Sequence, residues 1–334
     1  RISAPGAVLM EPSTGTVLYE KNGEEQRSPA SITKIMTLLL IFEALEDGQI
    51  TLEEEVVTSA YAKSMGGSQV FLEEGEKQTV ETLIKCIVVA SGNDASVVMA
   101  EHLAGSEEEF VKRMNEKAGE LGMIHTQFED CCGLTDSEEH YTTASDVAIV
   151  SRELITRFPR ILEYSSIWME NIIHRTAQGE KEFCLTNTNK LIRSYEGCVG
   201  LKTGSTSVAK YCVSAVAQRG EMTLLAVVMG APDAKVRFKD AAALLDYGFG
   251  KCNLYLDENR KNPDPVPIKG GVKAEVSCRY TGEFRYLDTE GKNLSQIEKK
   301  IVYMKNLQAP VKKGDIVGEA QYLLDGKVIG KTDI

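Results

Sequence analysis

Apolar and polar positions along the chain change their period several times. Two short apolar runs, residues 7–10 and 16–19, flank the turn-forming segment Pro12-Ser13-Thr14-Gly15, which predicts a β-hairpin. Residues 31–46 have the apolar spacing of a helix that ends before Gly48. The sequence from 54 to 157 is rich in helical periodicity, clearest at 80–89 and 95–103.

Strand periodicity returns after residue 201. Two runs at 211–217 and 222–229 are separated by Gln218-Arg219-Gly220-Glu221, which indicates a second hairpin. An amphipathic helix is expected over 236–247, ending at Gly248. Strands at both ends of this region, with helices between them, favour one α/β domain whose sheet uses both ends of the chain segment.

A second, smaller domain is expected after a proline cluster. Pro263, Pro265 and Pro267 mark a linker or the entrance to an edge strand. Short β-like runs follow at 273–280, 300–304 and 316–323, and Asp325-Gly326 predicts a last hairpin with a strand at 327–329. We therefore divide the chain into domains 1–252 and 253–334, the second of them all-β.

Composition narrows the class of protein. The 334 residues suffice for two domains, and 43% hydrophobic and 26% charged residues are ordinary for a globular protein. The longest apolar stretch, residues 35–42, is far shorter than the roughly 20 residues that span a bilayer. The net charge is −11, which argues against a nucleic-acid partner. The start at Arg1 suggests a processed or trimmed N-terminus, and a membrane-binding segment beyond Ile334 is left open.

The eight cysteines show no metal-binding spacing. No Cys-x-x-Cys pair occurs, and the four histidines do not stand at zinc spacing beside the cysteines. Adjacent Cys131 and Cys132 are poorly placed to share one metal ion. We expect small buried thiols, with disulfide pairing left open, and no metal site.

Ser31 and Lys34 form the first candidate for chemistry. They stand three residues apart where the first long helix begins, so the hydroxyl and the amine share one face. A lysine whose pKa is lowered by desolvation can take the proton of a serine nucleophile. A second Ser-x-x-Lys, Ser207 to Lys210, leads into an expected strand, where the two side chains would point to opposite faces.

Two further motifs follow in order. Ser91 and Asn93 flank a glycine where an apolar helix would end, and Lys202-Thr203-Gly204 comes before the strand pair. A turn can aim a hydroxyl and an amide into a cleft, and a lysine and a hydroxyl on a strand edge can bind a carboxylate. Each motif alone is more typical of an ordinary turn. Their joint occurrence with Ser31 and Lys34 matches the motif set of β-lactamases and penicillin-binding proteins.

The chain resembles the low-molecular-mass penicillin-binding proteins, the serine D-alanyl-D-alanine carboxypeptidases. The likeness extends over almost the whole chain, through segments around Ser31, Ser91, residues 187–191 and 200–204, and the ending at 307–327. It implies a β-lactamase/transpeptidase-like α/β (α+β) catalytic domain with an antiparallel sheet and a helical cluster, at 1–252. It also implies a small all-β C-terminal domain at 253–334.

The resemblance implies roles for eight residues. Ser31 would be acylated, Lys34 would accept its proton, and Ser91 would pass a proton to the departing D-alanine. The substrate-binding group would be Asn93, Lys202, Thr203, Gly204 and Ser205, with the backbone N–H groups of Ser31 and Ser205 as the oxyanion hole. No metal or cofactor would be needed.

The resemblance also implies partners and location. Peptidoglycan stem peptides would be substrates, and β-lactams would be covalent inhibitors. The chain would act outside the cytoplasm, at the cell wall or the outer face of the membrane. Association with a membrane surface through a segment beyond Ile334 is left open.

One stretch departs from the family pattern. Where the family commonly has Asn-Pro-His-Gly-Leu, this chain has Asp130-Cys131-Cys132-Gly133-Leu134. The loop lies outside the three motifs, so we expect catalysis to survive, with an effect on local packing and rigidity.

Alternative functions make different predictions. A class A-like β-lactamase would need a Glu-x-x-x-Asn signature, which the middle region lacks, and a D,D-endopeptidase would act on cross-linked wall. A non-catalytic wall-binding protein is disfavoured by the intact motifs. A Ser-His-Asp hydrolase is disfavoured because no Gly-x-Ser-x-Gly elbow is present.

Overall fold

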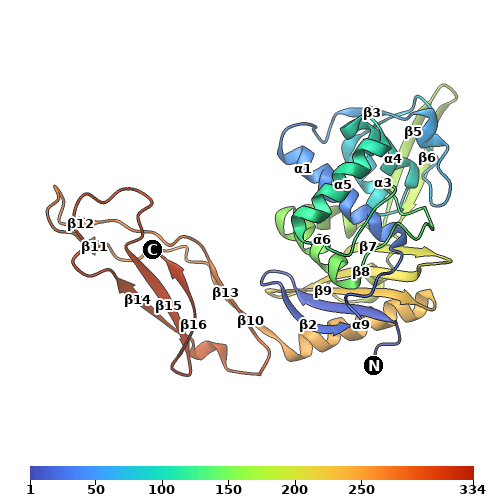
Figure 1. Cartoon of the computed structure of the whole chain (residues 1–334). Helices are drawn as coiled ribbons and strands as arrows, with labels where there is room; N and C mark the ends of the chain where they lie inside the picture. Colours follow the sequence, from blue (N-terminus) through green and yellow to red (C-terminus); the bar gives the residue numbers. More distant parts are fainter. The chain divides into compact units, whose positions relative to one another are not determined.

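A five-stranded antiparallel sheet organises the first part of the chain (Figure 1). Its strand order is β2-β1-β9-β8-β7, so the N-terminal hairpin pairs with strands from much later in the sequence. This confirms the prediction that the sheet draws on both ends. The strands are β1 (Gly6–Glu11), β2 (Thr16–Lys21), β7 (Cys198–Thr206), β8 (Lys210–Arg219) and β9 (Met222–Ala231).

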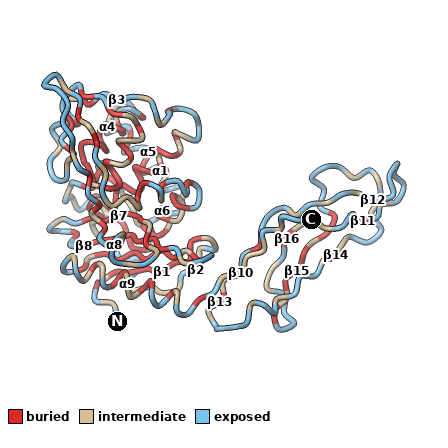
Figure 2. Tube along the Cα trace, turned by 180° about the vertical axis from the view of Figure 1, so that it is seen from behind, coloured by how far each residue is buried: buried red, intermediate tan, exposed pale blue.

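The computed structural model describes all residues from 1 to 334 and divides into two units, Arg1–Gly248 and Phe249–Ile334. In the first unit a cluster of helices covers one face of the sheet, and one long helix, α9, covers the other (Figure 1). Buried positions concentrate in the central strands and in the helices packed on them (Figure 2). The helices are α1 (Lys34–Glu46), α2 (Ala60–Lys63), α3 (Val80–Val88), α4 (Asn93–Ala104), α5 (Glu107–Leu121), α6 (Ala144–Arg157), α7 (Ile161–Ser165), α8 (Leu191–Ser194) and α9 (Ala234–Lys251).

The expected end of the last helix at Gly248 is wrong, because α9 continues to Lys251. A Cβ atom at Gly248 would lie 2.5 Å from Leu224 Cδ1 and 3.2 Å from Leu9 Cδ2. The glycine therefore allows the helix to pack closely on the sheet, and it does not act as a helix stop.

Two small antiparallel strand pairs stand outside the central sheet. They pair β3 (Glu55–Val57) with β4 (Lys77–Thr79), and β5 (Met169–Thr176) with β6 (Gly179–Thr186). The sequence did not predict the β5–β6 hairpin. Six of the eight residues of β6 are exposed, so the apolar alternation that signals a strand is missing there.

The second unit is all-β, as expected. Its principal sheet contains β14 (Glu298–Tyr303), β15 (Gly318–Leu324) and β16 (Lys327–Asp333). A core forms where the rings of Phe284 and Tyr322 stack with centroids 4.0 Å apart. Two pairs complete it: β10 (Asn253–Asp257) with β13 (Phe284–Asp288), and β11 (Val266–Pro267) with β12 (Glu275–Val276). The strand expected over 273–280 is thus only two residues long.

Two further features concern the apolar character of the helices and the state of the cysteines. No helix in the chain combines the length and apolar character needed to cross a membrane. None of the eight cysteines is in a disulfide, and six of them are buried.

Candidate active site

Ser31 and Lys34 meet at the start of the first helix. Residues Ala30–Thr33 form a single 3₁₀ turn, and α1 begins at Lys34. This turn brings Lys34 Nζ to 2.9 Å from Ser31 Oγ, the contact that the sequence spacing predicts. The lysine side chain is fully buried, whereas Ser31 is partly accessible. A substrate can therefore reach the hydroxyl while the amine stays out of water.

The Lys34 amine has two other partners. Nζ donates to Asn93 Oδ1 at 2.6 Å and to the carbonyl oxygen of Cys132 at 2.9 Å. No carboxylate pairs with it. Burial lowers the pKa of Lys34, and this effect outweighs the opposing influence of Asp130 and Asp94. The site thus favours the uncharged amine more than water does.

Asn93 and Ser91 occupy the connection between α3 and α4. Asn93 is the first residue of α4, and its Nδ2 donates to the carbonyl of Gly66 at 2.9 Å, which directs Oδ1 toward Lys34. Ser91 is buried with φ +59°, and its hydroxyl has no hydrogen-bond partner in the protein. A left-handed, unpartnered serine is rare enough in a core to indicate a functional constraint.

Lys202, Thr203, Gly204 and Ser205 lie within the edge strand β7, which passes beside Ser31. A Cβ atom on Gly204 would lie 2.8 Å from the backbone nitrogen of Ser31, so only glycine lets the strand approach this closely. Lys202 Nζ donates to the carbonyl of Thr203 at 2.9 Å. The Thr203 hydroxyl lies 2.6 Å from the hydroxyl of Thr188. The sequence analysis named the segment of Thr188 only as part of the family resemblance, without a role in the site.

Arg237, on α9, is a residue that the sequence analysis missed. It is buried, and its Nη1 lies 3.5 Å from the carbonyl of Gly204 and 3.4 Å from that of Cys212. Burial lowers the pKa of Lys202 well below its usual range, and the proximity of the basic groups of Lys34 and Arg237 lowers it further. None of these three basic residues forms a salt bridge. A site with three buried basic groups and no acidic partner attracts an anion.

The loop at 130–134 takes part in the site, although it lies outside the three motifs. Its Cys132 carbonyl accepts from Lys34, and Asp130 accepts the N–H groups of Cys132 and Gly133. Gly133 has φ +79°, and a Cβ there would lie 1.7 Å from the Ala30 carbonyl oxygen. These contacts run through the backbone, so they tolerate the unusual Cys-Cys side chains.

The structure excludes the second Ser-x-x-Lys pair, Ser207 and Lys210, as a catalytic pair, and we call it the decoy pair. Ser207 lies in the turn before β8, and Lys210 is the first residue of that strand. Both are exposed, and the two side chains form no hydrogen bond with each other. Only the pair at Ser31 has the buried amine that activation requires.

Comparison with known proteins agrees with this geometry. Residues 1–233 match the model of the D-alanyl-D-alanine carboxypeptidase family. The chain belongs to this family. Residues 261–334 match a second family, the C-terminal domain of penicillin-binding protein 5. The membership makes the chain a serine-type carboxypeptidase of the hydrolase class, with the fold that the sequence predicted.

Individual relatives support the assignment. The D-alanyl-D-alanine carboxypeptidase DacF of Bacillus subtilis is 42% identical over 332 residues, which are 99% of this chain and 84% of DacF. The crystal structure of penicillin-binding protein 5 from Haemophilus influenzae has a TM-score of 0.81 at 30% identity, covering 100% of this chain and 96% of that one. A mutant of the Streptomyces K15 DD-transpeptidase has a TM-score of 0.69 at 29% identity, covering 75% of this carboxypeptidase and 99% of its own chain.

Proposed function

We propose that this carboxypeptidase releases the terminal D-alanine of peptidoglycan stem peptides through an acyl-enzyme on Ser31. Ser31 Oγ attacks the carbonyl carbon between the two D-alanines, and its proton passes to Lys34 Nζ. The C–N bond then breaks, the departing D-alanine nitrogen receives a proton, and water hydrolyses the ester. The hydrogen bonds around Lys34 carry this proposal.

Those hydrogen bonds fix the direction of proton transfer. A neutral amine has two N–H donors and one lone pair. The carbonyl of Cys132 only accepts, and Asn93 presents its oxygen, because its Nδ2 is already committed to Gly66. Both donors of a neutral Lys34 are therefore used, and its lone pair is left for the Ser31 hydroxyl at 2.9 Å. Burial favours this uncharged form, so the arrangement is that of a general base.

We assign the other residues to proton delivery and substrate binding. Ser91 passes the proton to the leaving nitrogen, since its buried hydroxyl has no competing partner. Asn93 also holds the substrate peptide. The backbone N–H groups of Ser31 and Ser205 stabilise the developing oxyanion, and Gly204 allows β7 to come close enough to supply one of them.

A terminal carboxylate is the anion that the buried basic groups suit. Lys202, Arg237 and the Thr203 hydroxyl form its binding site. Lys34 and Lys202 lie close enough that a positive charge on one disfavours a positive charge on the other. Basic and hydroxyl groups beside the nucleophile suit an exopeptidase, because the residue that it releases carries the free carboxylate of the substrate.

The relatives are named D-alanyl-D-alanine carboxypeptidases and penicillin-binding proteins, which supports an action on peptidoglycan outside the cytoplasm. We propose that β-lactams acylate Ser31 because they mimic the D-alanyl-D-alanine end, and that the resulting adduct is hydrolysed slowly. We also propose that a further segment attaches the protein to the outer face of the membrane, and that the protein has no nucleic-acid partner. The net charge of −11 agrees with the latter.

The test uses the two serines of the Ser-x-x-Lys pairs. Ser31→Ala should abolish both D-alanine release from a pentapeptide ending in D-Ala-D-Ala and covalent penicillin labelling, with circular dichroism unchanged. Ser207→Ala, the matched control, should keep both activities. Labelling that persists in Ser31→Ala would show that another residue is the nucleophile. Release from cross-linked dimers, with little release from pentapeptide, would favour the endopeptidase instead.

A further inference from the structure

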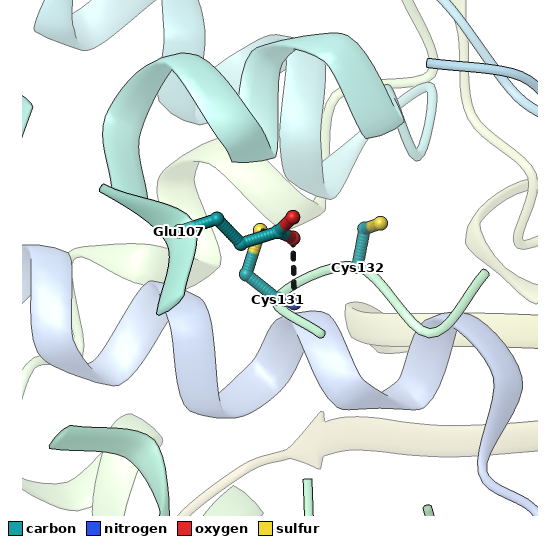
Figure 3. Close-up of side chains that lie close together, drawn as sticks. All are labelled: Glu107, Cys131 and Cys132. Atoms are coloured by element: carbon teal, nitrogen blue, oxygen red, sulfur yellow. Dashed lines mark hydrogen bonds between the residues drawn. The ribbon is translucent and has the colours of Figure 1, made fainter. Parts of the chain in front are cut away.

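The departure from the family pattern places two thiols next to a carboxylate. Glu107 is the first residue of α5, and Cys131 and Cys132 belong to the loop that follows this helix (Figure 3). One ligand atom from each residue, two sulfurs and a carboxylate oxygen, lie within 4.8 Å of one another. No other group of three histidine, cysteine or acidic side chains in the chain is arranged in this way.

The carboxylate in this cluster has no basic partner. Glu107 forms no salt bridge, and its oxygens instead accept from Tyr61 Oη at 2.7 Å, from Cys131 Sγ at 3.0 Å and from the Cys131 N–H at 3.2 Å. The two cysteines are 0% and 1% exposed. Glu107 and Tyr61 are partly accessible, which gives an ion a route from solvent. A half-buried carboxylate among neutral donors is an anionic site without a counter-ion.

The backbone holds the two thiols in place. The Thr37 hydroxyl donates to the Cys131 carbonyl at 2.6 Å, and Lys34 donates to the Cys132 carbonyl at 2.9 Å. Both carbonyls are thus directed to α1, and both sulfurs lie within 4.8 Å of a Glu107 oxygen. In Figure 3 the Cys132 sulfur points away from the carboxylate, so sharing one ion requires this side chain to rotate toward Glu107.

We propose that Glu107, Cys131 and Cys132 bind a thiophilic divalent cation of the zinc type. Zinc takes thiolate sulfur at about 2.3 Å and carboxylate oxygen at about 2.1 Å, which puts tetrahedral ligands roughly 3.6 Å apart. Side-chain rotations that move the ligand atoms by about 1 Å would bring them from within 4.8 Å of one another to this separation. Water or the Tyr61 hydroxyl takes the fourth position.

Binding of the ion is coupled to proton release. Each thiol must lose its proton, so M²⁺ and two thiols give M(SR)₂ and two H⁺. The cluster then keeps a total charge of −1, because two thiolates, one carboxylate and one dication replace two thiols and one carboxylate. Any effect on Lys34 therefore acts through the position of the Cys132 carbonyl rather than through a new net charge. This last step rests on the proposed role of Lys34.

Metal stoichiometry tests the site independently of catalysis. The full chain, kept reduced, is titrated with Zn²⁺ in competition with a chromophoric chelator, and calorimetry in buffers of different ionisation enthalpy counts the protons released. We expect one ion per chain and about two protons per ion. Changing a ligand's outer-shell partner typically costs 10- to 100-fold in affinity, so replacing both sulfur ligands with Cys131→Ser and Cys132→Ser should cost at least about 100-fold.

Controls separate this site from other thiols and from the active site. Cys184→Ser removes an exposed thiol outside the cluster and should leave the titration unchanged. Glu107→Gln should weaken binding while keeping both thiols. Equal Zn²⁺ affinity in the wild type and the double serine variant would overturn the proposal, as would loss of binding in Cys184→Ser. A change in the penicillin acylation rate on adding Zn²⁺, absent in the double variant, would show the coupling to Lys34.

Discussion

At the scale of single residues, the chemistry depends on how one lysine is surrounded. Its spacing from Ser31 predicted the contact, because one helical turn fixes it. The sequence placed one acceptor of the amine, Asn93, in the same site, but not the other, since Cys132 lies 98 positions away and contributes a backbone carbonyl. Arg237 was missed for a similar reason: it joins the site from a helix on the other face of the sheet.

Replacement of Lys34 tests the base directly. Lys34→Arg keeps a cation that does not deprotonate in a protein, so penicillin acylation should fall by at least about 100-fold, the lower range for general-base catalysis. Lys210→Arg makes the same change in the decoy pair and should have no effect. Acylation by Lys34→Arg at the wild-type rate would exclude the lysine as base.

The pH dependence follows from the same residue. Burial lowers the pKa of Lys34, and only the unprotonated amine accepts the Ser31 proton. The second-order acylation rate should therefore rise with pH along the titration of this amine, and fall as acid protonates it. Stopped-flow or quenched labelling across the pH range measures the profile. A rate that increases on acidification would contradict the assignment.

At the scale of elements, apolar periodicity predicted the strands and helices that bury one clear face. The hairpin at β1–β2, the pair β8–β9, and helices α3 and α4 lie where the pattern placed them. The β5–β6 hairpin was missed because its outer strand is largely exposed. The 3₁₀ turn before α1 also differs from a plain helix start, because β7 passes close to the backbone at Ser31.

Two glycines of α9 allow the effect of packing on stability to be measured apart from the effect of helix propensity. Gly248→Ala puts a methyl group against Leu224 and Leu9, and such overpacking typically costs 1–3 kcal/mol. Gly250→Ala meets no atom within 4 Å and should gain up to about 1 kcal/mol from helix propensity. Thermal unfolding should show a lower Tm for the first variant and an unchanged or higher Tm for the second. Equal shifts would show that Gly248 has no packing role.

At the scale of the whole molecule, the residues to which we assign catalysis and substrate binding all lie in the first unit. Ser31, Asn93, Lys202 and Arg237 fall within Arg1–Gly248. The Streptomyces K15 relative aligns over 99% of its own chain with only 75% of this one, so this similarity leaves a quarter of the present chain unmatched. What the all-β unit binds could not be predicted from the sequence, because no motif of known chemistry was found in that segment.

A fragment tests this division. We expect residues 1–252 to fold alone and to be acylated by penicillin at a rate within about threefold of the full chain, as a domain with its own core should be. Circular dichroism and gel-based labelling measure both properties. A folded fragment that is not acylated would show that the second unit completes the site.

The identity of the acylated residue tests the central claim most directly. The chain is labelled with penicillin, digested, and the modified peptide is sequenced by mass spectrometry. The account predicts one adduct per chain, on Ser31, and none in the Ser31→Ala variant. An adduct on Ser91, Ser207 or any other residue would contradict it.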